Sequence, residues 1–251
     1  MAHFHIPKPL HGWRSFVGEV GIIVLGVLIA LGAEQVVQSW EWRKQADEAR
    51  GALRAELGGD NLPQAYARLA VDPCLQTKLA GLQAALDRNV GRTEFASLAN
   101  DYSPPNRTWD DATWKAVGAS GVLSHGGSGE LVRWSLPYSL IVSLAPISVA
   151  EREDLSNLRS TSSSEGQLTP LERDRAQVAL QHLRERAQAT AVFSEALTEA
   201  SREAGVTLSR EQQEQALRDV RGEYGGCVVV PKIRRFSLTS QANFIWRRQA
   251  R

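Results

Sequence analysis

The strongest constraint on this 251-residue chain is an apolar stretch near its N-terminus. Residues 20–33 carry no polar side chain, and the segment 16–37 forms a helix of roughly 33 Å at about 1.5 Å per residue. A hydrocarbon core of about 30 Å requires a helix of this length. Three tryptophans flank the segment where aromatic rings favour the membrane interface: Trp13, Trp40 and Trp42. The sequence therefore predicts a transmembrane helix over residues 16–39.

A cleaved secretory signal peptide is the main alternative, because it also combines a slightly basic start with an apolar run. The run is long for that purpose, and no small-x-small cleavage site precedes a polar mature segment. The residues that follow, 40–44, read Trp-Glu-Trp-Arg-Lys, which is typical of a stop at an interface. A helix buried in a soluble core would not need these flanking residues. We therefore expect a short tail over residues 1–15 and an uncleaved anchor.

Small and acidic residues share one face of the predicted membrane helix. On a helical wheel these residues are Glu19, Gly26, Ala30 and Ala33, with Glu34 about 60° from Glu19. The spacing of Gly26 and Ala30 permits close approach of two helices, and a helix contact would also keep carboxylates away from acyl chains. This pattern favours self-association in the membrane. The alternative stays open that both acids reach the headgroups and that small residues are simply common in membrane helices.

Two stretches of the chain are similar to a known family. Residues 18–31, GEVGIIVLGVLIAL, are followed by Gln35 and Trp40, and residues 108–123 read TWDDATWKAVGASGVL. The first stretch closely resembles the N-terminus of a bacterial family of uncharacterised single-pass membrane proteins, of alphaproteobacterial type, and the second resembles it loosely. The resemblance implies a membrane-anchored helical protein. It brings no catalytic residues with it.

Helical periodicity continues beyond the membrane segment. We expect a helical stalk over residues 40–59 that ends at Gly58 and Gly59. Asp72 and Pro73 read as an N-cap and a first helical residue, and the helix they predict stops at Gly91. Its apolar stripe is Leu75, Leu79, Leu82, Leu86 and Val90.

Capping signals predict the later helices. Thr108 and Asp111 suggest a capping box, and a kinked helix is expected around Pro137. A serine-rich linker is expected near residues 160–168. Two further capping pairs, Thr169 with Glu172 and Ser209 with Gln212, predict helices that reach about Ala204 and Gly225-Gly226.

The expected fold class is therefore all-α, with an α-helical bundle over residues 60–226 and a short extended C-terminal segment. Residues 227–251 form a basic tail whose arginines could contact anionic lipid headgroups: Arg234, Arg235, Arg247 and Arg248. The formal net charge is only +1, so nucleic acid is not an expected partner. The expected partners are the lipid bilayer, a second copy of the chain and an unidentified protein. No cofactor or metal site is expected, because no phosphate-binding, dinucleotide or metal-ligand motif occurs.

The two cysteines and the flanking charges bear on the side of the membrane. Cys74 and Cys227 could form a disulfide in an oxidising compartment. They could also be unrelated thiols, or Cys74 could be a reactive thiol near a helix start. Counting basic residues on both sides weakly favours a cytoplasmic C-terminus, whereas a short tail before an anchor and a large domain is the layout of a signal anchor. We expect a single-pass protein of a bacterial inner membrane with a periplasmic domain.

A glycine-rich segment around His125 is the one feature that suggests catalysis. Neither Ser120 nor Ser128 lies in the G-x-S-x-G pattern of a nucleophile elbow, so a flexible connection explains His125 better. We therefore expect an interaction protein with a scaffold, assembly or sensor-like accessory role. The alternative is a membrane-tethered periplasmic enzyme, such as a hydrolase that uses His125.

Overall fold

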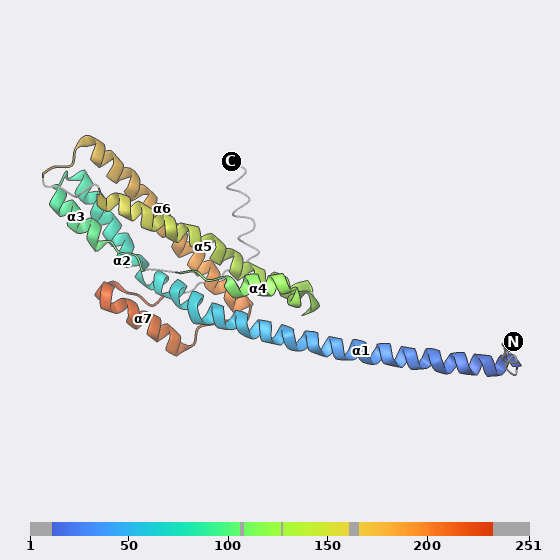
Figure 1. Cartoon of the computed structure of the whole chain (residues 1–251). Helices are drawn as coiled ribbons and strands as arrows, with labels where there is room; N and C mark the ends of the chain where they lie inside the picture. The colour runs from blue at the N-terminus through green and yellow to red at the C-terminus, as the bar shows by residue number, and fades with distance from the viewer. Residues whose placement is uncertain (1–11, 106–107, 127, 161–165, 233–251) are drawn as a thin grey trace, which may run out of the picture. The chain divides into compact units, whose positions relative to one another are not determined.

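The computed structural model describes residues 12–105, 108–126, 128–160 and 166–232 (Figure 1). Within these ranges the chain is α-helical and contains no β-strand; a single isolated bridge joins Gly91 and Gln167. The elements in chain order are α1 (Gly12–Glu56), η1 (Leu57–Asn61), α2 (Leu62–Asp87), α3 (Arg92–Asp101), α4 (Ala112–Ser120), η2 (Val122–Gly126), α5 (Ser128–Ser160), α6 (Pro170–Glu203), α7 (Arg210–Tyr224) and η3 (Gly225–Cys227).

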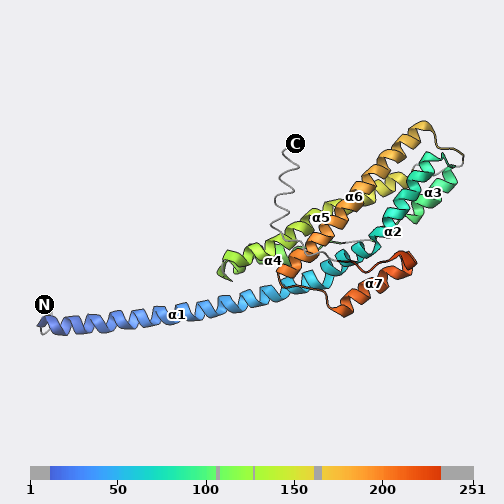
Figure 2. The same ribbon diagram turned by 180° about the vertical axis from the view of Figure 1, so that it is seen from behind.

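The chain divides into two compact units, Met1–Glu48 and Ala49–Arg251. The described part of the first unit is a single helix, the larger part of α1. The second unit contains the end of α1 and all later helices. Within it α6 lies between α2 and α5 and packs along both, as both views show (Figures 1 and 2).

The hydrophobic core of the second unit draws on five helices. Its buried residues include Leu75, Leu79 and Leu82 of α2, Phe95 of α3, Leu155 and Leu158 of α5, Leu180 and Leu183 of α6 and Val220 of α7. The leucine stripe predicted for residues 75–86 is therefore confirmed as a core face, and Val90 packs against it while half-buried. Burial of these side chains is the main favourable term that holds the helices together.

Both capping boxes predicted in the second half of the chain are confirmed. The Thr169 side chain accepts from the Glu172 backbone N–H, and the Glu172 carboxylate accepts from the Thr169 backbone N–H. Ser209 and Gln212 make the same reciprocal pair at the start of α7. These signals were predictable because every group involved lies within four residues of the helix start.

The predicted start of the leucine-striped helix is wrong. Pro73 lies inside α2, which begins eleven residues earlier with Pro63 in its first turn. An interior proline removes one backbone hydrogen bond, but Val71 and Leu75 on either side of it are fully buried, so packing retains the helix. The Asp72 carboxylate accepts from Arg68 instead of capping. The helix also ends earlier than Gly91, because Asn89 takes the left-handed conformation that reverses the chain.

Two other predicted boundaries differ from the structure. The stalk helix does not stop at Gly58 and Gly59; α1 passes through the π-helical turn η1 directly into α2. The helix predicted from Thr108 begins only at Ala112, whose N–H donates to Asp110 Oδ1 over 2.9 Å. Thr108 instead exchanges two backbone hydrogen bonds with the Gln64 side chain.

The predicted extended segment does not include Cys227, because Gly225–Cys227 form the short helix η3; Val228 has an extended backbone, and the described residues 228–232 join no strand. The Val229 N–H of this segment donates to the Ala70 carbonyl of α2, at 3.0 Å. The four arginines expected to contact lipid, Arg234, Arg235, Arg247 and Arg248, lie outside the described residues. Their predicted role stays a prediction.

Candidate functional site: an exposed apolar helix and a cross-linked helical domain

The apolar part of α1 presents its side chains outward along its whole length. Ile22 is 74% exposed, Leu28 is 60% exposed and Trp40 is 66% exposed. No residue in the most apolar 18-residue window of this helix is buried. A soluble protein rarely leaves so large a continuous apolar surface in water. The segment therefore has the length and composition to cross a membrane.

Helix α5 also has the length and composition of a membrane span, over Gly129–Ser160. A third of its most apolar window, 33%, is buried inside the protein. Trp134 and Tyr138 are 2% and 0% exposed, so one face of this helix belongs to the core. Of these two described helices, only α1 has an apolar segment that is exposed on every side, over residues 16–37.

The structure places the predicted helix-association residues in the exposed part of α1: Glu19, Gly26, Ala30, Ala33 and Glu34. A Cβ atom added to Gly26 would meet nothing within 4 Å. The packing of this chain therefore does not require glycine at this position. Trp13, Trp40 and Trp42 are also exposed.

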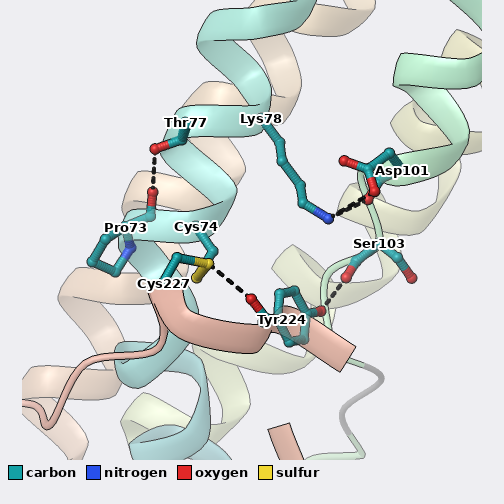
Figure 3. Close-up of a disulfide and its surroundings, with 8 residues drawn as sticks. All are labelled: Pro73, Cys74, Thr77, Lys78, Asp101, Ser103, Tyr224 and Cys227. Carbon is teal, nitrogen blue, oxygen red and sulfur yellow. Dashed lines mark hydrogen bonds and ion pairs between the residues drawn. A yellow bond between two sulfur atoms is a disulfide. The ribbon is translucent and has the colours of Figure 1, made fainter. Parts of the chain in front are cut away.

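A disulfide joins Cys74 of α2 to Cys227 at the end of η3, across 153 residues of sequence (Figure 3). Their Cα atoms are 5.5 Å apart, within the range that a disulfide needs. Cys74 is buried in the core, whereas Cys227 is exposed. Because both sulfurs are bonded, the structure offers no free thiol at Cys74.

Tyr224 holds the same end of α7 against the domain (Figure 3). Its hydroxyl donates to the Ser103 carbonyl, and Lys78 Nζ lies 5.6 Å from the centre of its ring. Lys78 also forms an ion pair with Asp101 at 3.1 Å. The disulfide and these polar contacts therefore fix the C-terminal end of the described chain to α2 and to the end of α3.

The last two turns of α1 are bound to α5 by charge. Arg50 and Glu130 form a two-pronged ion pair, with Arg50 Nη2 2.6 Å from Glu130 Oε2 and a second contact from Nε. Their side chains are 26% and 13% exposed. The hydrogen bond from Arg50 lowers the pKa of Glu130 against the opposing effect of burial.

Buried polar groups bind the end of α1 to α4 and to the chain before it. Glu56 is 7% exposed and accepts from the Thr113 backbone N–H over 2.8 Å. Asn61 exchanges hydrogen bonds with the backbone of Asp110. Tyr138 donates to the Leu53 carbonyl, and burial, followed by the nearby Glu56 carboxylate, raises the pKa of its hydroxyl. Residues 49–61 are thus an integral part of the helical domain.

The segment that suggested catalysis forms the short helix η2, Val122–Gly126. His125 lies on η2, and the hydroxyl of the preceding Ser124 donates to the Gly121 carbonyl at 2.6 Å. At the start of α4, Asp110 accepts from the backbone and Asp111 pairs with Lys115. Among the described residues no group of three or more His, Cys, Asp or Glu side chains could hold a metal ion.

The sequence did not predict the Arg50–Glu130 pair or the Glu56 contact. Their partners lie 80 and 57 residues away, and no local spacing connects them. The only signal in the sequence was the acid itself, Glu130, in the first turn of α5. No protein-family model matches the chain, and neither a curated protein nor a solved structure is found to be similar to it.

Proposed function

We propose that the protein is a single-pass protein of a bacterial inner membrane, anchored by α1, whose helical domain acts in the periplasm by binding other proteins. The observation that carries the anchor is the exposed apolar surface of α1. Burying such a surface in acyl chains releases free energy at about 25 cal/mol for each Å² removed from water. The resemblance of residues 18–31 to bacterial single-pass proteins supports the same assignment.

The periplasmic side is supported by the Cys74–Cys227 disulfide. Disulfides persist in oxidising compartments and are rare in the cytosol, where thiols are kept reduced. A domain of some 200 residues behind a short N-terminal tail crosses the membrane with little regard to its charge.

An interaction role is supported by what the helical domain contains. Three of its half-buried or buried polar side chains, those of Arg50, Glu56 and Asn61, connect one segment of the domain to another, and the described His, Cys, Asp and Glu side chains form no metal-binding cluster. We propose a scaffold, assembly or sensor-like accessory role. Self-association through the face that contains Gly26 and Ala30 belongs to this proposal.

Extraction of membranes at alkaline pH tests the anchor. The full chain should stay in the pellet and enter the supernatant only with detergent. A variant with Val24→Arg and Leu28→Arg should appear in the supernatant, because each charge at the centre of a span costs about 2.5–3.5 kcal/mol. Val178→Arg together with Val192→Arg, two exposed changes in α6, is the matched control and should stay in the pellet. Release of the unaltered chain without detergent would contradict the anchor.

Protease added to spheroplasts tests the side of the membrane. A periplasmic domain is digested in intact spheroplasts, and alkylation of whole cells before lysis leaves both cysteines unmodified because they are bonded to each other. Digestion only after the membrane is opened would place the domain in the cytoplasm. This result would not contradict the proposal that α1 spans the membrane.

A further inference from the structure

The outward face of α5 lacks the charges that a water-exposed helix usually carries. Residues 134–150 contain no Asp, Glu, Lys or Arg over 17 positions, about 25 Å of helix. The inward face of this stretch belongs to the core, with Trp134, Tyr138, Ile141 and Leu144 buried. The opposite face is exposed at Val132, Ser139, Val142, Pro146 and Val149.

The neighbouring helix α6 shows what an ordinary exposed face looks like in this domain. Its exposed valines, Val178 and Val192, are as open as Val142: the three are 53%, 54% and 54% exposed. Around Val178, however, the exposed side chains of α6 include Arg175, Gln181 and Glu185. The face of α5 therefore differs in its lack of charge and not in the exposure of single valines.

The serines on this face do not depend on water. The hydroxyl of Ser135 donates to the Val132 carbonyl, that of Ser139 to the Leu136 carbonyl and that of Ser143 to the Ser139 carbonyl, at 2.8, 2.7 and 2.9 Å. Each donor is thus satisfied within its own helix, so the face can lose its hydration at little cost. Residues of this size at four-residue spacing also allow another helix to approach closely.

The chemistry of the face argues against a lipid or a charged partner. A helix that lies on a membrane surface usually exposes aromatic side chains to the lipid, whereas the aromatic residues of this stretch, Trp134 and Tyr138, are buried in the core. A charged partner would lose hydration without gaining a counter-charge. The surface that binds here must therefore be an uncharged helix face. The same face of α5 in a second copy of the chain is such a surface.

The charges at the two ends of the face make it complementary to itself. Glu153 is the first exposed acid on the stripe, one turn beyond Val149. The opposite end is the first turn of α5, and the start of a helix carries partial positive charge. Antiparallel pairing of two copies places each Glu153 beside residue 128 of the other. The same register sets Val132 against Val149 and Ser139 against Val142.

We propose that the outward face of α5 binds the same face of a second copy in antiparallel orientation, forming a two-fold symmetric dimer. A two-fold interface uses one patch on both copies, as this register requires. The proposal does not depend on insertion of α1 into a membrane, because every residue that carries it lies in Ala49–Arg251.

Cross-linking of the full chain in mild detergent tests the proposal. The only two cysteines are bonded to each other, so an introduced cysteine is the one free thiol. A mixture of Val132→Cys and Val149→Cys copies should give a product of twice the chain mass with a short bismaleimide. Val132→Cys alone should not, since antiparallel pairing separates the two introduced thiols by about 25 Å. Efficient cross-linking of Val132→Cys alone, or none in the mixture, would overturn the antiparallel dimer.

A charge placed on the face gives a second, matched test. In a Gly26→Leu background, which removes the proposed contact through α1, Val142→Glu should weaken the dimer at least tenfold in analytical ultracentrifugation, because it buries an unpaired carboxylate. Val192→Glu, at a valine of equal 54% exposure, should leave the dimer unchanged. Equal thermal unfolding of the two variants shows that the fold is intact. A dimer that survives Val142→Glu, or a cross-linked product of another mass, would assign the face to a different partner or to none.

Discussion

Arg92 and Glu172 form an ion pair that joins the first turns of α3 and α6, 80 residues apart in the sequence. The same carboxylate accepts from the Thr169 backbone N–H and from its hydroxyl, at 2.8 and 2.7 Å. Glu172 therefore completes a local helix cap and a long-range contact at once. It lies where an acid also complements the helix dipole.

The pH dependence of the free energy of unfolding should include a contribution from the Glu172 carboxylate. Hydrogen bonds from Thr169, followed by that from Arg92, lower the pKa of Glu172 to about 2. Because the folded pKa is depressed, its stabilising contribution is present above the unfolded pKa near 4.5 and is lost as the pH falls towards 2. In urea unfolding, the difference in stability between the unaltered chain and Glu172→Gln should shrink from pH 6 to pH 2.5. Gln188→Ala, a change at an exposed position of α6 that carries no charge, should show no such change.

Loss of the disulfide should destabilise the domain. Cross-linking across 153 residues restricts the unfolded chain, and removal of such a bond typically costs about 2–5 kcal/mol. Cys227→Ser should lower the free energy of unfolding by this amount in urea titrations, and reductant should lower that of the unaltered chain similarly. The variant itself should be insensitive to reductant. Equal stability of oxidised and reduced protein would show that the bond is not formed in solution.

The Arg50–Glu130 pair should matter more than an exposed pair on the same domain. Glu130→Gln removes a half-buried acceptor of two charged hydrogen bonds and should destabilise the domain by about 1–3 kcal/mol. Glu214→Gln breaks the Arg210 pair, where the arginine is 93% exposed, and should change stability by less than about 0.5 kcal/mol. Calorimetric unfolding of both variants checks the ranking. Equal melting temperatures of Glu130→Gln and Glu214→Gln would show that the Arg50–Glu130 pair does not hold the end of α1 to α5.

Gly26→Leu separates packing within the chain from association between chains. A side chain at this position meets nothing within 4 Å in the isolated chain, so the fold should be unaffected. If the face with Ala30 is a contact in the membrane, the added bulk should reduce detergent-resistant dimers severalfold on gels. Leu28→Ile, a volume-conserving change on the opposite side of the helix, is the control. Unchanged dimers in Gly26→Leu would remove this face from the proposed function.

The parts of the fold that were predictable from sequence are those set by neighbouring residues. The buried stripe from Leu75 to Leu86 and the caps at Thr169 and Ser209 depend on spacing within one element. Pro73 misled the same reasoning, because its place inside α2 depends on the burial of Val71 and Leu75 against distant helices. A local rule has no access to that packing.

The candidate site divides in the same way. The apolar segment of α1 was visible at once, since composition and length define it. The contacts of Arg50 and Glu56 were not, because their partners are far along the chain. From the sequence, a disulfide was one of three interpretations of Cys74 and Cys227. The fold places their Cα atoms 5.5 Å apart and joins the two sulfurs.

The bond between Cys74 and Cys227 also determines what a single proteolytic nick can release. Helices α3 to α7 all lie between the two cysteines in sequence. A protease that cuts once anywhere in this interval leaves two polypeptides that remain covalently joined, one of which carries α1. Such a nicked molecule would migrate as one band without reductant and as two with it, and its domain would stay attached to α1.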